Sequence, residues 1–205
     1  HYGHKDFILA LGYRGDYIKD YFVNYDETIS NDFVYSKGGK SIELINSDID
    51  DWNITFVDTG INSNIGMRLM KVRQYLEGEE MFLANYSDGL SDIHLPSLID
   101  HFKEQPDKVA SFASYKPTAS FHVIQSEDDG LVTSISPISN AKLWLNVGYF
   151  AFRPQIFDYM EYGDELVAEP FQRLIENKKL TTYHHNGFWE AMDTFKDKMK
   201  LDDMQ

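Results

Sequence analysis

The sequence predicts an α/β fold in which a mixed, mostly parallel sheet is flanked by helices. Short apolar runs bounded by polar residues or glycine, such as residues 7–11, are typical of strands buried on both faces of a sheet. Segments with apolar residues at helical spacing lie between these runs, and in residues 66–76 they share one face. Strands that alternate with helices in this way favour a sheet with parallel strands.

We expect a single domain over residues 1–205. A chain of 205 residues is long enough for one sizeable core, and its hydrophobic fraction of 42% is enough to fill that core. We find no linker, internal repeat or low-complexity stretch that would divide the sequence.

Each element is predicted from its own local pattern. Pro96 falls in the first turn of a helix, where its missing N–H has no partner to lose, and Pro154 closes a strand. We expect strands over residues 7–11, 53–57, 81–84, 109–114, 120–125, 131–135, 146–152 and 180–184, and a hairpin with a glycine turn over residues 33–45. We expect helices over residues 16–22, 66–76, 95–102, 169–177 and 191–199, and a short one through Ile156 and Tyr159.

The composition excludes several classes of function. A formal net charge of −14 argues against a nucleic-acid surface, which needs clustered Lys and Arg, but permits a site that takes phosphates together with a metal cation. The absence of Cys excludes disulfides, thiolate metal sites and a Cys nucleophile. No apolar run approaches the roughly 20 residues of a membrane span, and residues 1–6 do not form a signal peptide. We therefore expect a cytoplasmic enzyme with neither a nucleic-acid nor a membrane partner.

Residues 81–93 contain the strongest candidate site. An apolar strand ends near Tyr86, and Asp88-Gly89 follows at once. Ligands bind just past the carboxyl ends of strands in open α/β sheets, and Gly89 would let another backbone approach closely. Asp88 is therefore well placed to hold a divalent metal on a phosphate. The alternative is a plain Asp-Gly turn.

Four stretches of the chain resemble one family in order. They are residues 7–22 (FILALGYRGDYIKDYF), 58–76 (DTGINSNIGMRLMKVRQYL), 85–93 (NYSDGLSDI) and 187–198 (GFWEAMDTFKDK). Together they resemble the sugar-1-phosphate nucleotidyltransferases, most closely the glucose-1-phosphate cytidylyltransferases. The resemblance implies a Rossmann-like nucleotidyltransferase fold. It also implies transfer of a nucleotidyl group from a nucleoside triphosphate, expected to be CTP, to a sugar 1-phosphate, with release of pyrophosphate, for nucleotide-sugar and polysaccharide biosynthesis.

The resemblance also implies three catalytic residues. Asp88 and Asp193 match the family's metal-binding aspartates, and oxygen ligands of this kind suit Mg²⁺. Arg68 matches an arginine that contacts the nucleotide. Two alternatives remain at this stage. Asp193 could be the N-cap of the last helix, since Asp is a preferred cap, and Arg68 could be a solvated helix residue.

Further residues would bind substrate by the same resemblance. Tyr86 would line the base or ribose pocket, beside Gly89, or else be a core tyrosine at a strand end. Asn146 and Gly148 match an Asn-Gly-Gly that contacts the sugar. Glu169 would hold sugar hydroxyls, or else be an acid favoured at a helix start. Trp189 could form a wall of the site or lie in the core. His184 and His185 are adjacent on a predicted strand, so their side chains would point to opposite faces and could not bind the same metal.

The sequence departs from the family pattern in three places. The family's GGxGTR nucleotide-binding loop and its Lys-Pro segment are not found, so we expect either part of a longer protein or a chain that cannot turn over. The acceptor-binding Lys of Glu-Lys-Pro is replaced in Ser136-Pro137-Ile138, and an Arg is replaced by Ser120. Lys142 could supply a cation instead. The alternative function is a non-catalytic sugar-nucleotide-binding or assembly domain of the same fold, and a homo-oligomer stays open.

Overall fold

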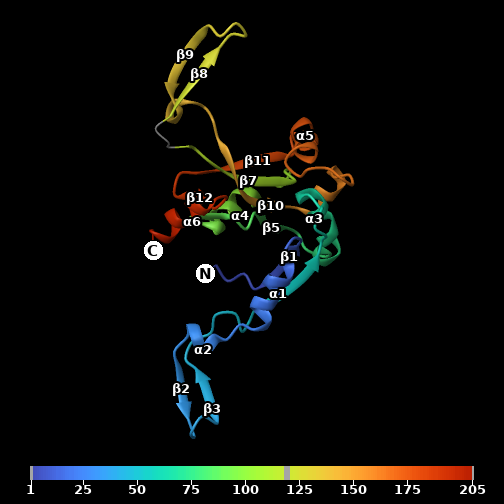
Figure 1. Ribbon diagram of the computed structural model, residues 1–205. Helices are drawn as coiled ribbons and strands as arrows, with labels where there is room; N and C mark the ends of the chain where they lie inside the picture. The colour runs from blue at the N-terminus through green and yellow to red at the C-terminus, as the bar shows by residue number, and fades with distance from the viewer. Residues whose placement is uncertain (1, 118–120, 205) are drawn as a thin grey trace. The chain divides into compact units, whose positions relative to one another are not determined.

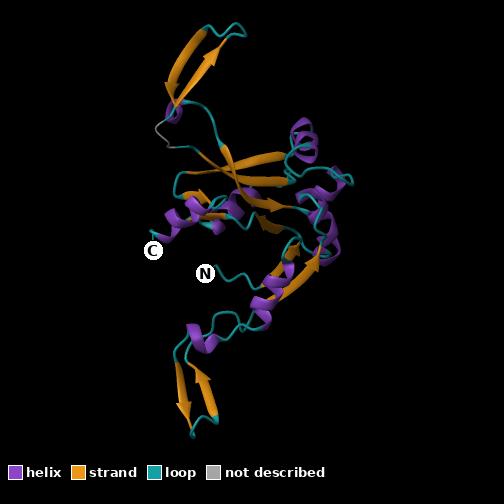
Figure 2. Ribbon diagram, viewed as in Figure 1, coloured by secondary structure: helices purple, strands orange, loops and turns teal. Residues whose placement is uncertain are grey.

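The computed structural model describes residues 2–117 and 121–204, and it divides into two compact units. The first unit comprises the residues up to Glu77 together with Met160–Glu169, and the second comprises Gly78–Tyr159 and the residues from Pro170 onward. Helices and strands occur in both units (Figure 2), which agrees with the predicted α/β class. The expected single domain stays a prediction.

The first unit is built around two parallel strands. β1 (Asp6–Leu11) and β4 (Asn53–Asp58) pair in register from their first residues to their last. The buried face of α3 (Ile65–Val72) includes Leu69 and Val72, as the helical spacing predicts. The other elements of this unit are α1 (Gly15–Val23), α2 (Glu27–Ser30), the strands β2 (Phe33–Ser36) and β3 (Ser41–Leu44), and the 3₁₀ helix η1 (Arg73–Leu76).

The hairpin of the first unit matches its prediction, but the helix before it was not predicted. β2 and β3 pair antiparallel on either side of the glycine turn. The four-residue helix α2 is too short to show a helical period. It is held by Glu27, whose carboxylate accepts hydrogen bonds from the backbone N–H of Asp48 (3.2 Å) and Ile49 (2.8 Å).

The second unit contains a four-stranded mixed sheet (Figure 1). Its strands, in order across the sheet, are β11 (Leu180–His185), β7 (Ala110–Tyr115), β10 (Leu145–Phe152) and β5 (Phe82–Asn85). β11 runs parallel to β7, whereas β10 runs antiparallel to both β7 and β5. The sheet is thus mixed, as predicted, but less parallel than predicted. The chain joins β7 to β10 through a hairpin instead of a crossover helix, and a hairpin connection suits an antiparallel pair.

The core of the second unit forms where helices cover this sheet. Leu98 and Phe102, on α4 (Leu95–Lys103), are fully buried, as are Phe150 and Phe152 on β10. Each such side chain contributes about 1.5–3 kcal/mol through its removal from water. A second helix, α5 (Glu169–Glu176), buries Leu174.

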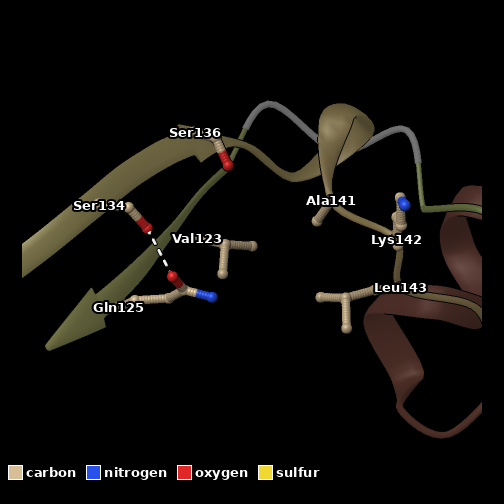
Figure 3. A pocket seen from close by; sticks show the side chains of 7 residues that line it. All are labelled: Val123, Gln125, Ser134, Ser136, Ala141, Lys142 and Leu143. Carbon is tan, nitrogen blue, oxygen red and sulfur yellow. Dashed lines mark hydrogen bonds between the residues drawn. The ribbon is translucent and has the colours of Figure 1, made fainter.

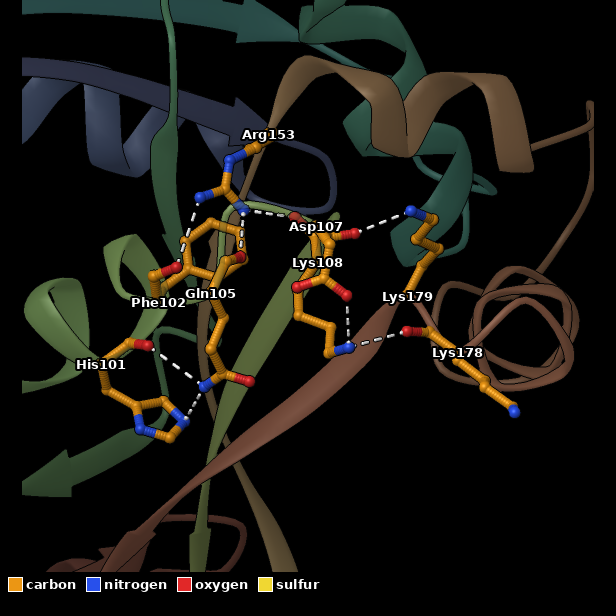
Figure 4. A network of polar contacts seen from close by, with 8 residues as sticks. All are labelled: His101, Phe102, Gln105, Asp107, Lys108, Arg153, Lys178 and Lys179. Carbon is orange, nitrogen blue, oxygen red and sulfur yellow. Dashed lines mark hydrogen bonds and ion pairs between the residues drawn. The ribbon is translucent and has the colours of Figure 1, made fainter.

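A network of basic side chains ties the end of α4 to the sheet (Figure 4). The guanidinium of Arg153 donates to the carbonyl oxygens of Phe102 and Gln105, both at 3.3 Å, and lies over the Phe102 ring. Phe102 is in the last turn of α4, and its carbonyl also accepts the Gln105 N–H at 3.1 Å, while the Gln105 carbonyl also accepts the Lys108 N–H at 3.1 Å. Lys108 donates to the Lys178 carbonyl at 3.0 Å and Lys179 to the Asp107 carbonyl at 2.9 Å. The cations therefore have a structural role here.

The remaining elements of the second unit are short. They are β6 (Gly89–Ser91), β8 (His122–Ser126), β9 (Val132–Pro137), η2 (Ile138–Asn140), η3 (Pro154–Tyr159), β12 (Trp189–Ala191) and α6 (Phe195–Asp202). β8 and β9 form a hairpin that extends away from the four-stranded sheet (Figure 1). The prediction of a helix over residues 191–199 placed its start too early, because Ala191 belongs to β12. No helix among the described residues is both long and apolar enough to cross a membrane.

Candidate active site

A short two-stranded ribbon brings Asp88 and Asp193 together. β5 ends at Asn85, a turn follows, and β6 begins at Gly89. β6 pairs antiparallel with β12, and the Met192 N–H donates to the Asp88 carbonyl oxygen at 2.8 Å just past the paired residues. Asp193 is the next residue. Two carboxylates far apart in the sequence thus lie at the same end of one ribbon, and both are exposed.

Asp193 is not the cap of the last helix, so that alternative was wrong. The N-cap of α6 is Thr194, whose hydroxyl accepts a hydrogen bond from the Asp197 N–H at 3.2 Å. The Asp197 carboxylate in turn accepts one from the Thr194 N–H at 2.9 Å, which completes a capping box. The Thr194 hydroxyl also donates to the Asp197 carboxylate at 2.7 Å, and this bond is the largest cause that holds the pKa of the Asp197 carboxyl below its usual value.

The carboxylates of Asp88 and Asp193 have the chemistry that Mg²⁺ requires. Neither carboxylate has a hydrogen bond or an ion pair to another described residue, so their oxygens face solvent. No group of three or more His, Asp or Glu residues within the described chain is arranged to hold a metal. Mg²⁺ is often bound by one or two carboxylates plus waters and substrate phosphates, and this pair fits that pattern.

Two side-chain hydrogen bonds fix the ribbon against β10. The Tyr149 hydroxyl donates to the Gly89 carbonyl at 2.9 Å, and the Trp189 indole N–H donates to the Val147 carbonyl at 3.2 Å. Burial raises the pKa of the Tyr149 phenol above its usual value, so it remains a donor at neutral pH. A side chain at Gly89 would lie 3.3 Å from the Trp189 indole nitrogen. Trp189 packs against the buried cluster around Ile93, which agrees with the core alternative.

Tyr86, Asn146 and Gly148 meet where β5 and β10 lie side by side. The Tyr86 N–H donates to the Gly148 carbonyl at 2.9 Å, and the Gly148 N–H donates to the Asn146 side-chain oxygen at 3.0 Å. The Tyr86 ring packs edge-on against Phe150, with centroids 5.2 Å apart. Tyr86 is half-buried and Asn146 is exposed. The strand-end core alternative for Tyr86 therefore agrees with the structure, while Asn146 keeps its amide nitrogen available to a ligand.

Arg68 belongs to the first unit, at the carboxyl ends of β1 and β4. Its guanidinium donates to the Thr59 hydroxyl at 2.7 Å, and that hydroxyl donates to the Leu11 carbonyl at 2.7 Å. A Cβ at Gly12 would lie 2.3 Å from the guanidinium nitrogens. Arg68 is half-buried, so it is not the solvated helix residue of the alternative reading.

Sequence reasoning missed the residues that hold Arg68. Thr59 is fully buried, and Lys71 donates to its carbonyl oxygen at 2.5 Å. Gly12 directly follows one predicted strand and Thr59 lies two residues past the end of another, and these positions were the available signal. Arg68 and Lys71 together place two cations where open α/β sheets bind ligands.

Glu169 also belongs to the first unit and is the first residue of α5. One of its carboxylate oxygens accepts a hydrogen bond from the Glu165 N–H at 2.9 Å. The helix-start alternative for Glu169 therefore agrees with the structure, and its other carboxylate oxygen makes no hydrogen bond to a described residue.

Lys142 and Ser136 line one pocket at the base of the β8–β9 hairpin (Figure 3). The pocket has a volume of about 380 Å³. The Ser134 hydroxyl donates to the Gln125 side-chain oxygen at 2.9 Å within it. The complete lining is Val123, Gln125, Ser134, Ser136, Ala141, Lys142 and Leu143. Ser120 lies outside the described residues.

The adjacent histidines of β11 face different surroundings, as predicted. The His184 ring stacks on Trp144, with centroids 3.8 Å apart. The His185 side chain is buried, and its Nε2 lies 2.9 Å from a carboxylate oxygen of Asp92. The two imidazoles therefore cannot bind one metal.

Solved structures with the same architecture show which fold this chain has. A Bacillus anthracis protein described as a glucose-1-phosphate thymidylyltransferase in complex with a sucrose superposes with a TM-score of 0.56, at 14% identity, over 98% of this chain and 94% of that chain. HddC from Yersinia pseudotuberculosis superposes with a TM-score of 0.62, also at 14% identity, over 100% of this chain and 80% of that one. The fold is thus the Rossmann-like nucleotidyltransferase fold.

Sequence similarity then identifies the family. No protein-family profile matches the chain. The glucose-1-phosphate cytidylyltransferase of Salmonella typhi is 31% identical over 202 residues, which cover 98% of this chain and 78% of the relative. The chain belongs to the sugar-1-phosphate nucleotidyltransferase family, and nucleotidyl transfer to a sugar 1-phosphate is the enzyme class of that family.

Proposed function

We propose that this protein catalyses Mg²⁺-dependent transfer of a cytidylyl group from CTP to a sugar 1-phosphate, with release of pyrophosphate. The observation that carries the proposal is the backbone hydrogen bond from Met192 to Asp88, which brings Asp193 beside Asp88. CTP as the donor is supported by the name of the Salmonella typhi relative. The reaction needs positioning and charge neutralisation more than a covalent nucleophile.

Asp88 and Asp193 would hold the Mg²⁺ ion. When bound, the ion would neutralise phosphate charge and polarise the reacting phosphate. The chain's own residues have separate tasks. Arg68, held by Thr59, would direct its guanidinium at nucleotide oxygens, because a guanidinium presents paired donors to phosphate. Asn146 would orient the sugar through its free amide nitrogen.

The acceptor is proposed to be a phosphorylated sugar or polyol other than glucose 1-phosphate. The family's acceptor lysine, the middle residue of Glu-Lys-Pro, is replaced within Ser136-Pro137-Ile138, and a nearby arginine is replaced at Ser120. Lys142 shares a pocket with Ser136, and it has no recorded ion pair among the described residues. A pocket of about 380 Å³ lies within the usual range of small-molecule sites, roughly 300–1,000 Å³. This supports Lys142 as the cation that receives the acceptor phosphate.

The test of the metal site is substitution of its carboxylates. We expect Asp88→Asn and Asp193→Asn each to lower Mg²⁺-dependent turnover by at least about 100-fold, since the loss of a metal ligand removes several kcal/mol of charge stabilisation at about 1.36 kcal/mol per tenfold. The measurement is pyrophosphate release from CTP with a panel of sugar phosphates. Asp100→Asn, an exposed helix position of the same unit, is the matched control. Activity within a few-fold of wild type in either site variant would show that the residue is not a ligand.

A further inference from the structure

The ribbon that carries the acidic pair continues beyond its assigned strands at both ends. At one end the Met192 N–H donates to the Asp88 carbonyl at 2.8 Å, and at the other the Asp92 N–H donates to the Phe188 carbonyl at 3.3 Å. Both bonds keep the register of β6 against β12. Asp88 and Asp92 therefore lie at opposite ends of one ladder, and a slip at the Asp92 end would displace the residues at the Asp88 end.

A buried histidine closes the Asp92 end of this ladder. The Nε2 atom of His185 lies 2.9 Å from Asp92 Oδ1, 3.0 Å from the Phe188 carbonyl oxygen and 3.3 Å from the Ser91 hydroxyl. The side chain of His185 is only 9% exposed. A carboxylate and a carbonyl only accept hydrogen bonds, so we assign a proton to Nε2. His185 thus donates to both strands of the ribbon.

The loop before β12 is closed tightly around the same group. Asp92 Oδ1 also accepts the Phe188 N–H at 2.6 Å, and the Ser91 hydroxyl donates to the Phe188 carbonyl at 2.8 Å. A Cβ at Gly187 would lie 2.3 Å from Asp92 Oδ1 and 2.7 Å from a carbon of the His185 ring. Both backbone polar groups of Phe188 are therefore engaged, and only glycine fits beside them.

We propose that Ser91, Asp92 and His185 are positioning residues that fix the register of the ribbon and so hold Asp193 beside Asp88 in a geometry fit for a divalent cation. This rests on the proposed metal site. The network does not supply metal ligands itself. It determines where the chain places the two carboxylates, much as outer-shell partners orient the ligands of metal sites.

The test measures Mn²⁺ binding, with the ion alone as the probe and the free ion counted by electron paramagnetic resonance. Asp92→Leu keeps the approximate size of the side chain and removes both accepted hydrogen bonds, whereas Asp92→Asn keeps an oxygen acceptor. We expect Asp92→Leu to weaken Mn²⁺ binding about 10- to 100-fold, the usual effect of losing an orienting partner. Asp92→Asn should stay within about 3-fold of wild type, because its amide oxygen still accepts both bonds.

Two further variants, Asp100→Leu and Asp88→Asn, distinguish a positioning role of Asp92 from other causes of weaker Mn²⁺ binding. Asp100→Leu, on the exposed side of α4, controls for loss of an aspartate elsewhere. Asp88→Asn should lose Mn²⁺ binding, and wild-type binding in that variant would overturn the proposed metal site itself. If Asp88→Asn loses binding while folded Asp92→Leu binds Mn²⁺ like wild type, the metal site stands and the positioning role is wrong.

A milder variant keeps the proposal testable if Asp92→Leu does not fold. Ser91→Ala removes only the hydroxyl that bonds the Phe188 carbonyl, and it should weaken Mn²⁺ binding in the same direction by a smaller factor. Circular dichroism at the temperature of measurement establishes that each variant is folded. Unchanged Mn²⁺ affinity in folded Ser91→Ala would overturn the proposal in that case.

Discussion

Gly148 has a φ of +78°, and a Cβ there would lie 2.7 Å from the ring of Tyr86. Both facts exclude a larger residue, for different reasons. The positive φ is a backbone conformation that side chains rarely adopt. The short distance reflects close packing of Tyr86 against β10. Asn146 lies at the same irregularity in the pairing of β10 with β7, so the shape of this part of the candidate site depends on a residue with no side chain.

We expect Gly148→Ala to lower the free energy of unfolding by about 2–4 kcal/mol, through backbone strain plus overpacking against Tyr86. Gly78→Ala is the matched control, because Gly78 has a φ of +90° but no atom within 4 Å of its Cβ position. That variant should lose only the strain, about 1 kcal/mol. The measurement is urea denaturation followed by fluorescence. Equal losses in the two variants would show that the contact with Tyr86 adds nothing.

Single residues were placed in the expected local structure where a sequence motif marked them. Asp88 and Arg68 were found in motifs: Asp88 lies in the turn between β5 and β6, and Arg68 lies on α3. Their roles stay predictions. Thr59 was missed because its importance comes from burial and from three partners distant in sequence, which a motif does not display. From the sequence, Asp193 and Thr194 were both possible N-caps of the last helix, because Asp and Thr are both preferred at that position. Only the structure shows that Thr194 is the N-cap of α6.

At the scale of elements, long periodic segments were predicted, whereas the three-residue strands β6 and β12 were not. α4 and β10 differ from their predicted ranges by one residue, since an apolar face or run defines them. β6 and β12 have three residues each and carry no period of their own. Their pairing depends on tertiary contacts with β10 through Tyr149 and Trp189. The ribbon that joins the candidate metal ligands was therefore the part of the fold least accessible from the sequence.

The capping box gives a prediction for α6. Thr194→Ala removes the hydroxyl that caps the helix and should cost about 1 kcal/mol. The pKa of Asp197 is held below its usual 3.8, chiefly by the Thr194 hydroxyl. A carboxyl whose pKa is lower in the folded state than in the unfolded state stabilises the fold at pH values above its unfolded pKa. This stabilisation is lost as the pH falls through the pKa of the folded state. In wild type, α6 should therefore remain capped at pH 5 and above and fray below about pH 4.

Amide hydrogen exchange of residues 195–202, measured between pH 6 and pH 3, tests this prediction. Exchange rates are corrected for the intrinsic pH dependence of the amides. Thr194→Ala should lose protection already at pH 6, with little further loss on acidification. Ser97→Ala, in the first turn of α4, is a control for removal of a helix-start hydroxyl elsewhere. Protection of α6 that does not change in Thr194→Ala would contradict the capping role.

At the scale of the whole molecule, charge and substrate must be reconciled. The chain has a formal net charge of −14, yet its proposed substrates are anionic phosphates. Such a protein can bind them only where cations are concentrated, either in side chains or in a bound metal. The candidate cations are Arg68 and Lys71 in the first unit and Lys142 in the second. The distribution of these few cations should therefore decide which phosphorylated compounds are accepted.

Binding of the acceptor phosphate should depend most strongly on these cations. A phosphate monoester carries close to two negative charges near pH 7. Replacement of two family cations, one within Ser136-Pro137-Ile138 and one at Ser120, removes two charge-assisted hydrogen bonds of about 1.5–3 kcal/mol each. Affinity for glucose 1-phosphate should then be lower by about two to four orders of magnitude, at about 1.4 kcal/mol per tenfold. Lys142 can offset part of this loss for an acceptor whose phosphate reaches the pocket that it shares with Ser136.

We therefore expect glucose 1-phosphate to be a poor acceptor, with a kcat/KM well below 10⁴ M⁻¹s⁻¹, roughly the lower end of efficient enzymes. For the preferred acceptor, Lys142→Ala should raise KM by about 10- to 100-fold, the effect of one lost charge-assisted hydrogen bond, with kcat less affected. Lys116→Ala is the matched control, because Lys116 lies in the same unit and outside the pocket. The assay follows pyrophosphate release with several sugar and polyol phosphates and CTP. Efficient use of glucose 1-phosphate that is insensitive to Lys142→Ala would show that the two replaced cations are not needed and that the acceptor is the one named for the Salmonella typhi relative.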